Sequence, residues 1–243
     1  MCTVVLLIRP GHPYPVMLAA NRDERTDRAF LPPAAHWPDR PGIVGGQDVT
    51  AGGTWLAVNR HGLVAAILNR AGSLGPAPSK RSRGELPLLA LDAADTEGAE
   101  AIIRDRDLGA YRSFNLVLAD RAGARVLCAD GDGDARTIHL ERGVHMVTAH
   151  DPDDAAGSPR VARHLPRFAA APPPDTDDWA AWRALLADRS GPPGTELTVP
   201  DRDGFGTVCA TLLAIPAAQG APVSLWFAPG PPDRAAFARV AQP

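Results

Sequence analysis

The chain has a single lysine, Lys80, among its 25 lysine and arginine residues. A Schiff-base lysine, or the lysine of a phosphate-binding P-loop, could therefore only be Lys80. Cysteine is also scarce, because the chain has three, Cys2, Cys128 and Cys209, widely spaced and odd in number. This pattern argues against a disulfide framework and favours a reducing compartment.

Long apolar runs and a surplus of one charge are missing as well. The apolar run 2–8 is too short to span a bilayer, and it lacks the basic segment and cleavage site of a secretory signal. We therefore expect a cytoplasmic protein with no membrane span. The net charge of −3 and the pI of about 6.1 give no electrostatic reason to expect nucleic acid as a partner.

Motifs for cofactors and metals are incomplete. The acidic run 130–134 resembles part of a calcium loop, but its sixth position is Ala135, so a tight turn is the better interpretation. The glycine pairs 45–46 and 52–53 lack the strand–helix context of a nucleotide-binding loop. Histidines and cysteines show no zinc-ligand spacing, and we expect no cofactor and no metal. The loop 70–83 carries Lys80, Arg81 and Arg83, and we interpret it as a solvated loop rather than a phosphate site.

The order of apolar patterns predicts strands, helices, strands, helices and strands again. Strands are predicted over residues 2–8, 16–20, 54–59, 63–68, 115–119, 125–129, 137–140, 144–149, 208–215 and 223–227. Helices are predicted over residues 86–94, 96–104, 159–170, 177–189 and 233–240. Regular strand–helix–strand alternation is missing, so a doubly wound parallel sheet is disfavoured. The sequence predicts an α+β fold in which two antiparallel sheets stack between helical layers, as one domain over 1–243.

Cys2 is a candidate catalytic residue because it directly follows Met1. Methionine before a small residue is normally trimmed, which would give Cys2 a free α-amine beside its thiol. The thiol is a strong nucleophile, and an α-amine with a pKa of roughly 7.7–8.0 can act as a base near neutrality. N-terminal nucleophile (Ntn) hydrolases combine the two groups in this way. The alternative is that Cys2 is simply a small apolar residue that begins a strand.

A hairpin formed by the first two strands would bring charged residues to Cys2. If Ile8 pairs near Val16, Cys2 lies opposite Arg22, whose charge would favour the thiolate. Asn69 ends a later strand and could supply an amide donor to an oxyanion.

Five motifs follow one another with specific spacing. They are Cys2-Thr3, LAANRDE at 18–24, GGTWL at 52–56, RGEL at 83–86 and FNLVLAD at 114–120. In this combination the chain resembles the NRDE family, also known as transport-and-Golgi-organisation type proteins. The resemblance covers roughly the first half of the chain and implies an Ntn-hydrolase fold, a four-layer αββα sandwich.

A wider resemblance runs to choloylglycine hydrolases, which are Ntn amidases with a cysteine nucleophile. It implies that Cys2 is the nucleophile, Arg22 its supporting arginine, Asp23 the carboxylate near the amine and Asn69 the oxyanion donor. The motifs also suggest four substrate-binding residues: Asn21, Glu24, Trp55 and His150.

Two positions depart from the family pattern. Val208 stands where relatives carry an active-site arginine, and the segment 148–150 replaces a Ser-Asn pair, so that His150 would be a substitute donor. Two functions are therefore kept. The first is hydrolysis of a linear amide or similar acyl bond in a small-molecule substrate. The second is non-catalytic handling of haem or an acyl lipid in the same cleft. The oligomeric state is left open.

Overall fold

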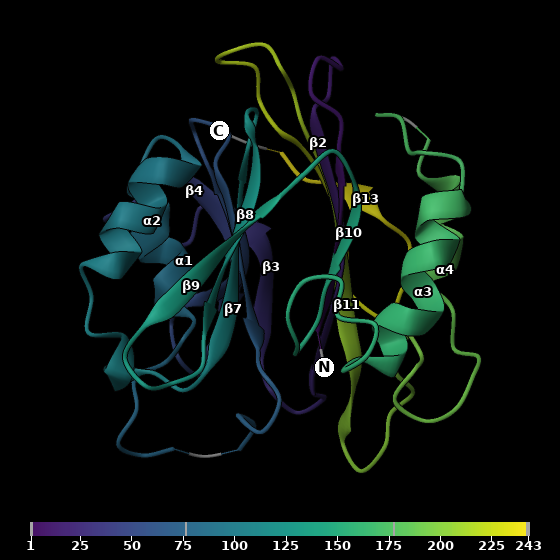
Figure 1. Ribbon diagram of the computed structural model, residues 1–243, viewed down its shortest axis with the longest axis horizontal. Coiled ribbons are helices and arrows are strands. Elements are labelled where there is room, and N and C mark those ends of the chain that lie inside the picture. The colour runs from purple at the N-terminus through teal and green to yellow at the C-terminus, as the bar shows by residue number, and fades with distance from the viewer. Residues whose placement is uncertain (1, 76, 177, 242–243) are drawn as a thin grey trace.

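Two β-sheets lie face to face, and a helical layer covers the outer face of each sheet (Figure 1). The computed structural model describes residues 2–75, 77–176 and 178–241. Within these residues every pair of neighbouring strands is antiparallel. The α+β sandwich predicted from the sequence is confirmed. The expected removal of Met1 concerns a residue outside the described ones.

The first sheet has the strand order β10-β1-β2-β11-β12-β13. Its strands are β1 (Thr3–Ile8), β2 (Val16–Arg25), β10 (Gly143–Val147), β11 (Phe205–Ile215), β12 (Ser224–Ala228) and β13 (Ala238–Arg239). The register pairs Ile8 with Val16 and Thr3 with Asn21, as the hairpin prediction required. Continued by one residue, this register sets Cys2 across from Arg22.

The second sheet has the strand order β3-β4-β5-β6-β7-β8-β9. Its strands are β3 (Phe30–Ala34), β4 (Ile43–Asp48), β5 (Thr54–Asn59), β6 (Val64–Asn69), β7 (Phe114–Asp120), β8 (Gly123–Ala129) and β9 (Ala135–Leu140). Each strand pairs with the next one along the chain, and the longest connection, residues 70–113 between β6 and β7, contains two of the helices.

Among the described residues, four α-helices form the outer layers (Figure 1). The helices α1 (Glu85–Ala90) and α2 (Thr96–Arg104) cover the second sheet, and α3 (Pro159–Ala170) and α4 (Ala180–Leu186) cover the first. A short 3-10 helix, η1 (Leu108–Ala110), precedes β7. The side chain of Asp95 caps α2 and that of Ser158 caps α3, because each accepts a hydrogen bond from a first-turn backbone N–H.

Strand β1 shows why apolar runs mark this fold. Val4 and Leu6 enter the apolar layer between the sheets, whereas Val5 and Leu7 pack beneath α3 and α4. Both faces of the strand are buried, so the run is continuously apolar instead of alternating. The same period of two places the Cys2 side chain between the sheets.

The structure corrects the predicted elements at four places. Strands β3 and β4 lie in a segment that the sequence analysis left without strands. Strand β2 continues beyond residue 20 to Arg25, because its charged end pairs with β11. The helix predicted over 233–240 is wrong, since that segment contains the two-residue strand β13. The helix predicted over 177–189 is shorter, at Ala180–Leu186, and residue 177 lies outside the described residues.

Candidate active site

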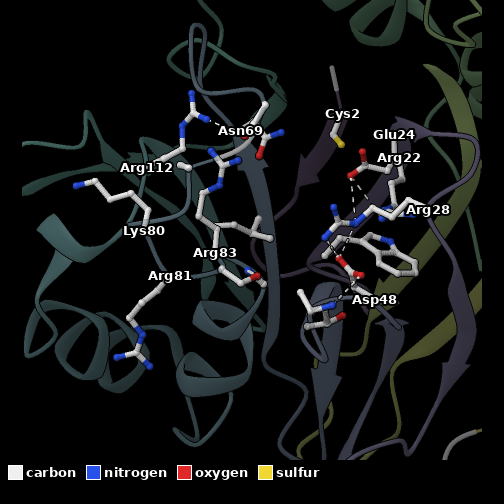
Figure 2. Close-up of a pocket in the computed structure, with 18 of the residues that line it drawn as sticks. Cys2, Arg22, Glu24, Arg28, Asp48, Asn69, Lys80, Arg81, Arg83 and Arg112 are labelled. Atoms are coloured by element: carbon white, nitrogen blue, oxygen red, sulfur yellow. Dashed lines mark hydrogen bonds and ion pairs between the residues drawn. The ribbon is translucent and has the colours of Figure 1, made fainter. Parts of the chain in front are cut away.

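A cavity of about 360 Å³ opens where β1 begins and β6 ends. Figure 2 shows Cys2, Arg22 and Glu24 on one side, facing Asn69 and several cationic side chains on the other. The described lining includes six of the eight residues predicted for the site: Cys2, Arg22, Asp23, Glu24, Trp55 and Asn69. Residues far apart in the sequence therefore meet in one cavity.

Cys2 is partly exposed at the start of β1. Its Sγ lies 3.5 Å from the backbone oxygen of Asp23, which accepts a hydrogen bond from the thiol. Burial, followed by the negative charge of the Asp23 carboxylate, raises the pKa of the Cys2 thiol above its usual value. Arg22 acts in the opposite direction but is outweighed. Arg22 thus favours the thiolate, as its position opposite Cys2 predicts, but it does not overcome the effects of burial and of Asp23, so the resting thiol needs a base.

Arg22 is 6% exposed and reaches from β2 between the sheets. Its guanidinium carbon lies 4.4 Å from the centroid of the Trp55 ring, which places the cation on an aromatic face. Its Nη2 lies 3.6 Å from Oε2 of Glu24. Its Nη1 is buried without a hydrogen-bond partner among the described residues. A donor of this kind inside a cavity can serve a substrate oxygen.

Asp23 faces the α3 side of the sheet, where its carboxylate is fully buried. Its Oδ2 accepts a hydrogen bond from Arg160 at 3.1 Å, and its Oδ1 accepts one from Thr207 Oγ1 at 2.6 Å. Arg160 also donates to Thr3 Oγ1 at 3.0 Å. The pair thus ties α3 to β1, β2 and β11 directly behind Cys2.

Arg160 and Thr207 were missed by the sequence analysis. Thr207 faces Asp23 because β11 carries a register shift between Thr207 and Cys209, where Val208 is the extra residue. Val208, which stands in place of the family arginine, thus lies at this bulge. Arg160 lies in the first turn of α3, after the helix cap at Ser158. A buried arginine side chain indicates a buried carboxylate nearby, but the sequence does not reveal that Arg160 is buried.

Asn69 ends β6 and borders the cavity from the second sheet. The loop that follows supplies the rest of this wall, including Lys80, Arg81 and Arg83. Arg83 donates to Ser73 Oγ at 2.7 Å and to Ser113 O at 2.8 Å, so it holds the loop against the start of β7. The interpretation of 70–83 as a solvated loop holds for Lys80 and Arg81, which are exposed, but not for Arg83, which is partly buried.

Asn21 and His150 are missing from the described lining of the cavity. The amide nitrogen of Asn21 donates to the backbone oxygens of Leu186 at 3.0 Å and Leu197 at 2.9 Å, so this side chain ties β2 to the segment after α4. The His150 ring lies 4.0 Å from the Asp154 carboxylate. Asn21 also lines a smaller hollow together with Cys2 and Arg22, whereas His150 does not. Substrate contacts of Asn21 and His150 stay predictions.

Within residues 2–75, 77–176 and 178–241, no group of three or more histidine, cysteine or acidic side chains could hold a metal ion. Within the same ranges, no helix is both long enough and apolar enough to cross a bilayer.

The fold is that of the Ntn hydrolases. Solved structures that resemble the chain are a penicillin V acylase from Agrobacterium tumefaciens (17% identity, TM-score 0.55, covering 94% of this chain and 83% of that one) and a Caenorhabditis elegans N-acylethanolamine-hydrolyzing acid amidase orthologue (12%, 0.59, 89% and 94%). A variant of the conjugated bile acid hydrolase from Clostridium perfringens is a third (10%, 0.53, 100% and 97%). At these identities the likeness concerns the fold alone.

The chain belongs to the family Transport and Golgi organisation 2, whose model matches residues 1–172. The mouse homologue is 31% identical over 162 residues, covering 61% of this chain and 56% of its own length. The human homologue gives the same identity and coverage. The chain thus matches little more than half the length of these relatives.

Proposed function

We propose that this protein is a cysteine Ntn hydrolase that cleaves a linear amide or related acyl bond of a small molecule. The observation that supports this most strongly is the position of Cys2. Its thiol stands at the mouth of a cavity, beside the buried Arg22 and across from Asn69. Proteins of the same fold are named as an acylase, an amidase and a bile acid hydrolase. We also propose a cytoplasmic location and no nucleic-acid partner.

The proposed reaction requires the α-amine of Cys2, and hence removal of Met1. This amine takes the thiol proton while Sγ forms a bond to the substrate carbonyl carbon. Asn69 donates to the oxyanion, and Arg22 Nη1 orients the substrate oxygen. The leaving amine departs with the proton, which leaves a thioester. Water then attacks the thioester, the α-amine takes a proton from it, and the C–S bond breaks to restore the thiol.

Because the pKa of the Cys2 thiol is raised, the proposed reaction depends on the α-amine as a base. A cysteine that is protonated at rest must lose its proton during attack. Asp23 lies behind the start of β1 and would hold the amine in place. Its pairing with Arg160 and Thr207 reduces the negative charge that would otherwise keep the amine protonated and useless as a base.

A second function is non-catalytic handling of haem or an acyl lipid in the same cavity. Val208 in place of the family arginine and the raised pKa of Cys2 favour this alternative. Under it, binding would not depend on the thiol.

Intact-mass measurement and acyl-enzyme trapping separate the two functions. For the hydrolase, we expect loss of Met1, a thioester adduct on Cys2 with an activated acyl substrate, and no adduct with Cys2→Ala. Cys128→Ala serves as the matched control, because Cys128 is buried in the second sheet and should leave the adduct unchanged. Retained Met1, or full haem or acyl-lipid affinity in Cys2→Ala without any adduct on the parent chain, would contradict the hydrolase proposal.

A further inference from the structure

The two walls of the cavity differ in charge. The described lining has six cations and three carboxylates. On the side of Cys2, Glu24 is paired with Arg22 and Asp48 with Arg28, whereas the Asp23 carboxylate is buried on the α3 side of the sheet and paired with Arg160. The facing wall, formed by the loop after β6 and the segment before β7, carries cations (Figure 2).

Arg83 is the most enclosed cation of this facing wall. Its described partners are two oxygens of Ser73 and the backbone oxygen of Ser113, all of them uncharged. Burial, together with the nearby charge of Arg112, lowers the pKa of Arg83 to about 10. The guanidinium charge of Arg83 therefore has no counter-charge among these hydrogen-bond partners, and a bound anion would stabilise its protonated form.

Arg112 extends the same wall, and Lys80 lies at its exposed outer edge, with its side chain directed away from Cys2 (Figure 2). Lys80 Nζ donates to the backbone oxygen of Gly109 at 2.5 Å, and Arg112 donates to the backbone oxygens of Gly72 and Gly75. Arg81 forms an ion pair with Glu85 and contributes less net charge. Guanidinium groups present several N–H donors in a plane, which suits the paired oxygens of a carboxylate or phosphate.

We infer that the wall formed by Lys80, Arg83 and Arg112 binds an anionic group, a carboxylate or a phosphate, at the end of the substrate remote from the bond that Cys2 attacks. The identity of the reacting bond rests on the proposed function, whereas the binding of the anion does not. Neutral amides of the same size would enter the cavity but lose this contact. The substrate class is thus an acyl amide that carries an acidic group.

Binding to the Cys2→Ala protein tests this inference without any turnover. Three probes are compared by calorimetry at low ionic strength: N-hexanoylglycine, N-hexanoyl-phosphoethanolamine and the uncharged N-hexanoylglycinamide. We expect at least one anionic probe to bind about tenfold more tightly than the neutral one, as charge-assisted hydrogen bonds require. The stronger of the two anionic probes identifies carboxylate or phosphate as the preferred group.

Variants assign the preference to this wall. Arg83→Gln should remove most of it, and Lys80→Gln, a change at an exposed side chain, should reduce it without risk to folding. Arg106→Gln is the matched control, because this exposed arginine is not part of the described lining. Equal affinities for all three probes, or a preference that survives both Arg83→Gln and Lys80→Gln, would overturn the inference.

A second measurement uses the thiol as a reporter in the unsubstituted protein. Iodoacetate and iodoacetamide alkylate cysteine by the same displacement but differ in charge. We expect the rate with iodoacetate divided by the rate with iodoacetamide to be higher at Cys2 than at free cysteine. This ratio should fall in Lys80→Gln but not in Arg106→Gln. An unchanged ratio contradicts anion binding. An anion preference in a protein that never forms an acyl-enzyme contradicts only the proposed hydrolase activity.

Discussion

At the scale of single residues, the exposure of the Cys2 thiol favours its reactivity, whereas its raised pKa opposes it. The thiol is partly exposed in the cavity, while Cys128 and Cys209 are buried within the sheets. Burial raises the pKa of Cys128 to about 11 and that of Cys209 further. The pKa of Cys2 is also raised, so accessibility, and not thiolate character, distinguishes it.

We therefore expect Cys2 to be alkylated first of the three cysteines, but more slowly at pH 7 than an unperturbed thiol. The rate should continue to rise with pH above about 8.5, the ordinary cysteine pKa. Limited iodoacetamide labelling followed by peptide mapping measures both effects. Equal labelling of all three cysteines, or a plateau below pH 8, would contradict this expectation.

The buried pair of Asp23 and Arg160 gives a stability prediction. Their side chains are 0% and 2% exposed, so removal of one charge leaves the other without its partner in a poorly solvated place. We expect Asp23→Asn to lower the free energy of unfolding by about 3–5 kcal/mol. Urea titration checks this, and Asp27→Asn in the exposed pair with Arg25 is the control that should leave the midpoint unchanged. Equal midpoints for both variants would show that the pair does not stabilise the fold.

At the scale of elements, the sequence predicts a strand well where both of its faces are apolar. Strand β1 and the first part of β2 have this pattern, and the turn between them sets the register that brings Cys2 to Arg22. Strand β3 contains Pro32 and Pro33 and lies at the edge of its sheet, so its composition resembles that of a loop. Strand β4 was missed because Gly45 and Gly46 weaken its strand pattern.

Those two glycines are required by close packing. A Cβ atom at Gly46 would lie 2.2 Å from the Trp55 ring, the same ring on which Arg22 stacks. We expect Gly46→Ala to cost about 1–3 kcal/mol of unfolding free energy, as overpacking does, and to displace Arg22. Gly42→Ala is the matched control, since its added atom would meet Arg60 at an ordinary 3.5 Å. Urea titration compares the two, and an equal effect would rule out the packing explanation.

The candidate site, like the strands, could be predicted from the sequence only where local patterns determine it. Residues on the hairpin and at the end of β6 were predicted, because strand register and strand ends can be deduced locally. The contact of Asp23 with Arg160 could not be deduced, since it joins a strand to a helix 137 positions away. The cationic wall was also missed, because the sequence gives no sign that Arg83 is held against the start of β7 beside the cavity.

At the scale of the whole molecule, three apolar layers alternate with the two sheets and are tied together at their margins by ion pairs. Glu100 on α2 is the clearest of these ties. It accepts hydrogen bonds from Arg104 on its own helix, from Arg125 on β8 and from Thr137 on β9. The helical layer is thus fixed to two strands of the second sheet through one carboxylate.

This arrangement predicts how stability depends on acid. Hydrogen bonds from Thr137, Arg125 and Arg104 outweigh the effect of burial and lower the pKa of Glu100 from 4.5 to about 2. A carboxylate whose pKa is depressed in the folded state stabilises the protein fully above its unfolded pKa, and that contribution is lost as the pH falls through the folded pKa. We therefore expect the unfolding free energy to fall between about pH 4.5 and pH 2.

The variant Glu100→Gln should be less stable than the parent chain at pH 7, and its stability should fall less steeply below pH 4.5. The difference between the two proteins should shrink as the pH approaches 2, because protonation then removes the same charge from the parent. Urea titrations over this range measure both slopes. Glu97→Gln, on the exposed side of α2, is the matched control and should run parallel to the parent. If Glu100→Gln also runs parallel, the tie between α2 and the sheet contributes nothing to acid stability, and the depressed pKa has no energetic consequence for the fold.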